Sequence, residues 1–479
     1  MLFNSIAFLV FFPVVCALYF ASASRRWRVL LLLLASCVFY MAFVPAYILI
    51  LAFTIVVDYV AGILIARATV HRRLFLLASL AANIGVLAVF KYYPWIRENL
   101  AAVGVEAPPL GLALPIGLSF HTFQAMSYTI EVYRGHQPAE RNFLVYALYV
   151  MFFPQLVAGP IERPQNLLPQ FHFDHSFDAA RVAAGLRRMA WGLFKKVVVA
   201  DRVAVFADAV YGDPGAYHGL ALAVATVMFA FQIYLDFSAY SDIAIGSAQV
   251  LGFRLMENFD RPYLSRSVSE FWRRWHISLS TWFKDYLYVP LGGSRVTFPR
   301  HARNLLIVFL ISGLWHGASW TFVIWGGLHG SYLIVGHLTG PVRERLRAGL
   351  PAALIPVQRA LALLTTFALV TFAWIFFRAR TPADASLVVR NLFSGWGGDL
   401  HDLLARGSGG LPAVPLAPRV ALLALVLGIE RFGGRWTELE ALVQRRSGVV
   451  RFALYFVVVY AMVLGGGQGG AQQFIYFQF

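Results

Sequence analysis

Residues 305–320 read LLIVFLISGLWHGASW. The run from Leu305 to Leu314 is almost entirely apolar, and an ionisable side chain, His316, follows it within two residues. An apolar run of this length is typical of a short or re-entrant membrane segment, where an ionisable group is expensive to keep and is by default a candidate functional residue. We therefore expect a membrane segment that ends at a functional histidine.

The composition indicates an integral membrane protein. Of the 479 residues, 59% are hydrophobic and 13% are charged, whereas soluble domains carry about 25% charged residues. Because about 20 residues span a bilayer, we expect an all-α polytopic protein with roughly ten to twelve membrane segments, the shorter ones tilted, broken or re-entrant. The apolar stretches are residues 5–22, 29–43, 46–66, 74–90, 143–158, 220–235, 304–314, 320–336, 360–377, 419–429 and 450–464.

The charge balance fits the same class. Lys and Arg number 40 against 24 Asp and Glu, a formal net charge of +16. The positive-inside rule accounts for this excess through cytoplasmic loops, so no nucleic-acid partner is needed. The basic loops at residues 25–28 and 67–73 would then face the cytoplasm, and we expect Met1 to lie outside.

Several kinds of site are not supported by the sequence. Its two cysteines, Cys16 and Cys37, both lie in apolar runs, so neither a disulfide framework nor a cysteine metal site is predicted. It has no histidine pair at positions i and i+4 and no Gly-Lys-Ser/Thr phosphate loop. We therefore predict no metal site and no nucleotide-driven pump.

Polarity and turn residues divide the chain into four parts. We expect N-terminal membrane helices in residues 1–110 and a central core, which holds most motifs, in residues 111–380. Residues 381–418 are polar and rich in glycine and predict a surface helix followed by a loop. Residues 419–479 predict further membrane helices and an aromatic tail.

Arginines and aromatic residues alternate between residues 254 and 303, a mixture too polar to span a membrane. It is typical of amphipathic helices at the cytoplasmic interface. His276 lies in this segment beside two arginines, so we expect a site where cationic side chains receive an anionic, phosphate-bearing donor. A basic, lipid-facing surface with no catalytic role is the alternative. The candidates for donor binding are Arg273, Arg274, Lys284 and Tyr286.

The setting of His316 suits a general base, because a neutral imidazole accepts protons near neutral pH. Gly313 and Gly317 permit close backbone approach, and Trp315 would supply a rigid apolar wall beside a bound substrate. The alternative is a histidine that is hydrogen-bonded to a neighbouring helix carbonyl.

Two carboxylates, Asp236 and Asp242, lie in apolar sequence, where an unpaired charge is costly. Either Asp236 or Asp242 could orient a histidine or bind a substrate hydroxyl. Alternatively, either carboxylate could form a buried pair with Arg273 or Lys284.

The chain ends in an unusual tail, in which residues 465–473 form a Gly- and Gln-rich tether to the sequence FIYFQF at residues 474–479. Tyr476 is the one hydroxyl in that aromatic hexapeptide. Its oxygen could act as a nucleophile that carries an acyl group, or its ring could anchor the tail at the membrane interface.

Taken together, these motifs resemble the membrane-bound O-acyltransferase family, and most closely its branch that acetylates exopolysaccharides such as alginate. One departure is His121, where an aromatic side chain is expected. The motifs that carry the resemblance are PIGLSF (115–120), FFPQLVAGPI (152–161), GLFKK (192–196), YLDFS (234–238), FWRRWHISLSTW (271–282), DYLYVPLGG (285–293), GLWHG (313–317) and the hexapeptide at 474–479.

The resemblance implies a helical membrane fold in which a cytoplasmic and an extracytoplasmic funnel meet near His316, with His276 as the second signature histidine. It implies transfer of an acetyl group from a cytoplasmic thioester, acetyl-CoA or an acyl carrier, with no bound cofactor. It further implies a bacterial inner-membrane location, a periplasmic acetyltransferase partner, a polysaccharide acceptor and an acyl relay through Tyr476.

Two other functions stay open at the sequence level. One is transfer of D-alanyl or another acyl group to a different cell-wall polymer. The other is a polysaccharide or lipid transporter, which would show no dependence on an acyl donor and usually contains paired repeats.

Overall fold

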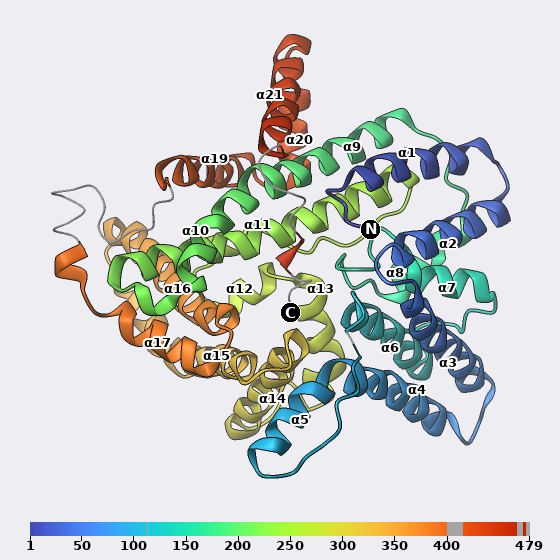
Figure 1. Cartoon of the computed structure of the whole chain (residues 1–479), viewed down its shortest axis with the longest axis horizontal. Helices are drawn as coiled ribbons and strands as arrows, with labels where there is room; N and C mark the ends of the chain where they lie inside the picture. The colour runs from blue at the N-terminus through green and yellow to red at the C-terminus, as the bar shows by residue number, and fades with distance from the viewer. Residues whose placement is uncertain (113, 400–414, 467–472, 476–479) are drawn as a thin grey trace. The chain divides into compact units, whose positions relative to one another are not determined.

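The computed structural model describes residues 1–112, 114–399, 415–466 and 473–475. Over these ranges the chain is helical and contains no strand (Figure 1), which confirms the predicted all-α class. The chain divides into two compact units, each assembled from separate segments. Among the described residues, the first unit comprises residues 1–193, 239–257 and 473–475, and the second comprises residues 194–238 and 258–466.

The first unit contains a set of helices in which α3, α4 and α6 pack against one another. Asp58 of α3 is fully buried among them and accepts hydrogen bonds from Ser79 and Asn83 of α4. The elements of this unit are α1 (Ile6–Ala21), α2 (Arg25–Met41), η1 (Pro45–Tyr47), α3 (Ile48–Arg67), α4 (Arg72–Leu87), η2 (Ala88–Tyr92), α5 (Tyr93–Ala102), α6 (Leu118–Arg134), α7 (Phe143–Met151), α8 (Pro164–Leu167), η3 (Leu168–His172) and α9 (Ala179–Phe194).

The second unit contains both candidate histidines, His276 and His316. Its longest helix, α11, continues past Ser238 into the first unit. The elements are η4 (Lys195–Ala200), α10 (Asp201–Gly212), η5 (Pro214–Ala216), α11 (Gly219–Leu251), η6 (Pro262–Leu264), α12 (Val268–Arg274), α13 (Ile277–Phe283), η7 (Lys284–Tyr288), α14 (Phe298–His316), α15 (Trp320–Ala348), η8 (Ala352–Leu354), α16 (Ile355–Arg378), α17 (Pro382–Leu392), α19 (Ala417–Gly433), α20 (Trp436–Gln444) and α21 (Gly448–Gly466).

Five helices in the described part of the chain are long and apolar enough to cross a membrane. The apolar stretch at residues 143–158 instead forms a nine-residue helix, α7, because Pro154 and the turns around it interrupt the run. The finer count of ten to twelve membrane segments stays a prediction. The five helices are Pro45–Arg67, Arg72–Ala102, Gly219–Leu251, Ala352–Arg378 and Gly448–Gly465.

Helices α14 and α15 form a hairpin whose backbones approach closely (Figure 1). A Cβ atom at Gly313 would lie 2.2 Å from the carbonyl oxygen of Phe322, and one at Gly326 would lie 2.1 Å from the carbonyl oxygen of Phe309. Small residues permit such contact between helices, as in many membrane proteins. Glycine is therefore required at both positions, and the hairpin fixes where the end of α14 lies.

Candidate active site

His316 is the last residue of α14. Gly317 leaves the helix in an extended conformation, with φ −158° and ψ 145°, and the side chain of Ser319 then accepts a hydrogen bond from the backbone N–H of Thr321 to cap α15. A Cβ at Gly317 would lie 2.1 Å from the ring of Phe322, so the turn permits only glycine. The side chain of His316 is 4% exposed.

His276 lies at the break between the two seven-residue helices α12 and α13. Its backbone is left-handed, with φ 42° and ψ 56°, and its side chain is fully buried. A non-glycine residue in this region costs on the order of 1–3 kcal/mol and persists only where neighbouring structure enforces it. Here Ile277 N–H donates to the carbonyl of Asn258 at 2.9 Å, and Asp260 N–H donates to the carbonyl of Arg274 at 2.9 Å.

The structure brings the two histidines together. Their ring centroids are 6.5 Å apart, with an interplanar angle of 61°. Aromatic rings surround the pair: Phe237 lies 4.7 Å from His276, and Trp315 and Trp325 lie 4.9 and 5.0 Å from His316. Both imidazoles therefore lie in an apolar, aromatic environment, and Trp315 forms part of the wall beside His316.

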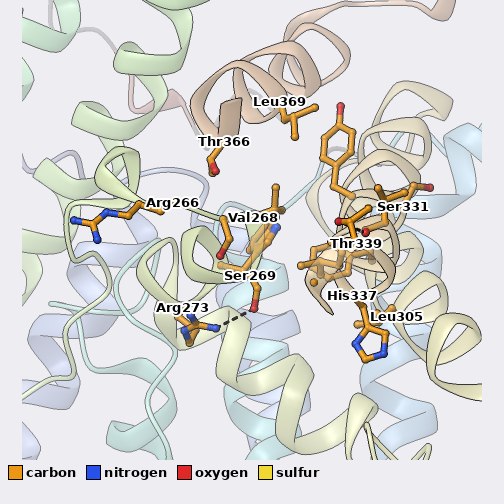
Figure 2. A pocket seen from close by; sticks show the side chains of 18 of the residues that line it. Arg266, Val268, Ser269, Arg273, Leu305, Ser331, His337, Thr339, Thr366 and Leu369 are labelled. Carbon is orange, nitrogen blue, oxygen red and sulfur yellow. Dashed lines mark hydrogen bonds between the residues drawn. The ribbon is translucent and has the colours of Figure 1, made fainter. Parts of the chain in front are cut away.

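A cavity of about 1530 Å³ lies in the second unit, between α12 to η7 on one side and α14 to α16 on the other. Figure 2 shows Arg266 and Arg273 apart from Ser331, Thr339 and His337, which project from α15. The lining includes Ile277, the residue after His276, and Ser312, one helical turn before His316, but neither histidine is itself among the described residues of the lining. The basic residues that line the cavity are Arg266, Arg273, Lys284, His301, His337, Arg343 and Arg347. One acidic residue, Glu344, also lines it.

The candidates for donor binding fall into two groups. Arg273 and Lys284 line the cavity, and Arg273 donates a hydrogen bond to Ser269 Oγ at 2.9 Å (Figure 2). Arg274 instead forms an ion pair with Glu270 at 2.7 Å. Tyr286 packs against Trp282 with ring centroids 5.0 Å apart. Neither Arg274 nor Tyr286 is among the cavity-lining residues in the described part of the chain.

Asp236, which is buried, and Asp242, which is partly buried, both form ion pairs, but the expected partners Arg273 and Lys284 were wrong. Asp236 pairs with Lys196 at 2.6 Å, and Lys196 also contacts Asp201 at 2.9 Å. The reason is geometric: Lys196 lies on η4, and α11 turns Asp236 toward it while Phe237 faces His276.

Asp242 is in the first unit, where it pairs with Arg188 at 2.9 Å. A role for Asp236 in substrate binding stays a prediction.

Tyr476 lies outside the described residues. Two residues before it in the tail, Phe474 is 2% exposed and meets the ring of Tyr240 edge-on at 4.5 Å, within the first unit. Ile475, which precedes Tyr476 directly, is 3% exposed.

Sequence reasoning missed three parts of this site. Asn258, 18 residues before His276, contacts its imidazole. His329 accepts a hydrogen bond at Nδ1 from the indole N–H of Trp272 at 3.2 Å, and Trp272 lines the cavity. Arg343 and Arg347 of α15 also line the cavity. Their i, i+4 spacing in the sequence would have predicted that both lie on one face of a helix.

Comparison with known proteins identifies what this chain is similar to. A model of the membrane-bound O-acyltransferase family matches residues 132–349. The probable alginate O-acetylase AlgI of Pseudomonas aeruginosa is 39% identical, over 90% of this chain and 82% of that protein. The probable alginate O-acetylase AlgI of Pseudomonas putida is 36% identical over 100% of both chains. A peptidoglycan O-acetyltransferase of Helicobacter pylori is 36% identical, over 75% of this chain and 73% of that protein.

Proposed function

Because this chain belongs to the membrane-bound O-acyltransferase family, we propose that it moves an acetyl group from a cytoplasmic thioester, acetyl-CoA, across the membrane for O-acetylation of an exopolysaccharide such as alginate. The observation that carries the proposal is the pair of buried imidazoles, with ring centroids 6.5 Å apart, in the same unit as a large cavity with a cationic lining that includes Ile277 and Ser312. The relatives named as alginate O-acetylases, which are similar over most of this chain, support alginate as the polymer.

His316 acts as the general base in this proposal. Its neutral imidazole removes the proton of an acceptor hydroxyl as that oxygen attacks the thioester carbonyl. Collapse of the tetrahedral intermediate breaks the carbon–sulfur bond, and the departing thiolate takes the proton from the imidazolium. General-base assistance of this kind contributes about 10²- to 10⁴-fold to a rate.

The cavity is the proposed entry for the donor. Arg266, Arg273 and Lys284 line it on one side and Arg343 and Arg347 on the other, and guanidinium groups bind phosphate in a bidentate manner. The phosphates of acetyl-CoA would lie among these cations. Its acetyl end would reach toward Ile277 and Ser312, beside the two histidines.

Family membership supports the rest of the proposal, and the positive-inside rule supports the orientation. We propose that the protein lies in the bacterial inner membrane with Met1 outside, in contact with lipid, and delivers the acetyl group to the extracytoplasmic side through two funnels that meet near His316. A periplasmic acetyltransferase completes the transfer to the polymer.

Tyr476 is the proposed relay in this transfer, and Tyr476→Phe tests it because the substitution removes only the phenolic oxygen. We expect loss of polymer acetylation and of any acetyl-tyrosine detected by mass spectrometry. Undiminished transfer would eliminate the relay.

The central test supplies labelled acetyl-CoA to the purified protein in vesicles. We expect His316→Ala to lower acetyl transfer by about 10²-fold or more. His121→Ala is the matched control, because His121 is equally buried but lies in the first unit. A wild-type rate of acetyl transfer by His316→Ala would contradict the proposal. Dependence on a D-alanyl thioester would favour the alternative acyl group, and independence from any thioester would favour a transporter.

The acceptor polymer has one specific alternative. The Helicobacter pylori relative is named a peptidoglycan O-acetyltransferase. Mass spectrometry of both polymers from cells that express the chain distinguishes the two acceptors.

A further inference from the structure

Asn258 is fully buried and has one side-chain oxygen at the centre of a hydrogen-bond cluster. Its Oδ1 lies 3.1 Å from Nδ1 of His276, 2.9 Å from Oγ of Ser278 and 3.3 Å from the backbone N of Ser278. The backbone carbonyl of Asn258 also accepts the N–H of Ile277. One residue therefore contacts the segment 276–278 through both its main chain and its side chain.

The contacts to Ser278 fix the direction of the bond to His276. A backbone N–H can only donate, so the amide atom that it meets must be the oxygen of Asn258, which can only accept. Oγ of Ser278 also lies 3.4 Å from Nδ1 of His276, but it donates its hydrogen to the Asn258 oxygen at the shorter distance of 2.9 Å, so Nδ1 donates its own hydrogen to that oxygen at 3.1 Å. Because a neutral imidazole carries one N–H and one lone pair, the lone pair of His276 lies on Nε2.

We propose that Asn258 is a positioning residue that holds His276 in its left-handed conformation and in the Nδ1–H tautomer, with the lone pair on Nε2. The chemical use of that lone pair rests on the proposed function, whereas the tautomer itself does not. A group that fixes one imidazole nitrogen determines which nitrogen is left for chemistry, as in other histidine sites.

His276 is surrounded by aromatic rings, by Ser278, whose Oγ lies 3.4 Å from its Nδ1, and by His316. Phe237 of α11, Phe259 and Trp315 of α14 contribute aromatic rings within 6.5 Å of its ring. Among the ring contacts of the described residues, the titratable group that faces it is His316 of α14. The titration of His276 after substitution of Asn258 is therefore followed together with that of His316.

The first experiment reads the tautomer directly. Protein labelled with ¹⁵N-histidine is incorporated into lipid bilayers, and the signals of His276 are identified by their absence in His276→Gln. We expect a protonated Nδ1 and an unprotonated Nε2 in the wild type, and a gain of the opposite tautomer in Asn258→Ala. A hydrogen on Nε2 of wild-type His276 would overturn the proposal, and this measurement needs no variant of Asn258 to fold.

The second experiment measures acetyl transfer from acetyl-CoA against pH. Asn258→Ala should lower kcat by about 10- to 100-fold with little change in KM, since the donor cavity is intact. Asn258→Asp keeps an acceptor but adds a negative charge, which favours the imidazolium. Activity that needs neutral His276 is lost as the pH falls, so the acid limb of the Asn258→Asp profile should move to higher pH by about one to three units.

Asn304→Ala is the matched control, because Asn304 is also a fully buried asparagine, with its amide donating to the carbonyls of Leu291 and Gly293. It should lower thermal stability but leave the acid limb and the His276 signals unchanged. An unmoved acid limb in Asn258→Asp with a shifted NMR titration would keep the positioning role and remove His276 from the chemistry. If neither readout moves in Asn258→Asp, Asn258 has only a structural role.

Discussion

Gly313→Ala tests whether close approach of α14 and α15 positions His316. The new Cβ would lie 2.2 Å from the carbonyl oxygen of Phe322, a rigid backbone atom, so the helices must separate by about 1.2 Å to reach an ordinary contact of about 3.4 Å. Overpacking of this kind costs about 1–3 kcal/mol of stability. A displacement of about 1 Å at a reacting group can cost about 10²-fold in rate.

Two helical glycines of the second unit, Gly327 of α15 and Gly428 of α19, serve as matched controls. A Cβ at Gly327 would meet only the flexible end of Leu310, at 3.7 Å, and one at Gly428 would meet nothing within 4 Å. Because alanine favours the helix over glycine by up to about 1 kcal/mol, both substitutions should be neutral or slightly stabilising.

The assay combines thermal unfolding of the purified protein in detergent with acetyl transfer in vesicles. We expect a lower Tm and about 10²-fold lower kcat for Gly313→Ala alone among the three variants. Wild-type stability and activity for Gly313→Ala, or equal losses in the controls, would refute the reasoning.

Two further predictions concern charge. Asp236→Asn should destabilise the protein by about 3 kcal/mol, at the lower end for a broken buried pair because Asp201 still contacts Lys196; an unchanged unfolding midpoint in denaturant would contradict this. Arg343→Glu, which reverses a charge in the cavity lining, should raise KM for acetyl-CoA with little effect on kcat, and the effect should shrink at high salt; an unchanged KM at low salt would remove Arg343 from the donor site.

The sequence was sufficient to predict the helical class and to select two histidines that lie close together in the structure, because both follow from local signals. The apolar run before His316 and the arginines beside His276 are contiguous in the chain, and the resemblance to the family rests on short motifs of the same kind. The partner of Asp236 could not be predicted in this way. Which face of α11 turns toward η4 depends on packing between segments that are distant in sequence, so Lys196 was missed.

Asn258 shows a second limit of sequence reasoning. Nothing in its neighbourhood distinguishes it from a turn residue, because its role comes from a backbone break at His276 that brings positions 18 residues apart into contact. The number of membrane segments could not be predicted from the sequence for another reason. Stretches such as residues 143–158 are apolar enough to suggest a span, but Pro154 ends the regular helix and the chain continues in turns.

Different contacts position the two histidines, although their rings lie close together. His316 is fixed by a glycine contact between long helices, whereas His276 is fixed by a hydrogen-bonded loop at a helix break. Each position can therefore be loosened without touching the other, through Gly313→Ala and through Asn258→Ala. Effects of residues that act as a unit are strongly non-additive. A double variant that is no slower than the slower single variant would place both imidazoles in one chemical step, and losses that multiply would place them in independent roles.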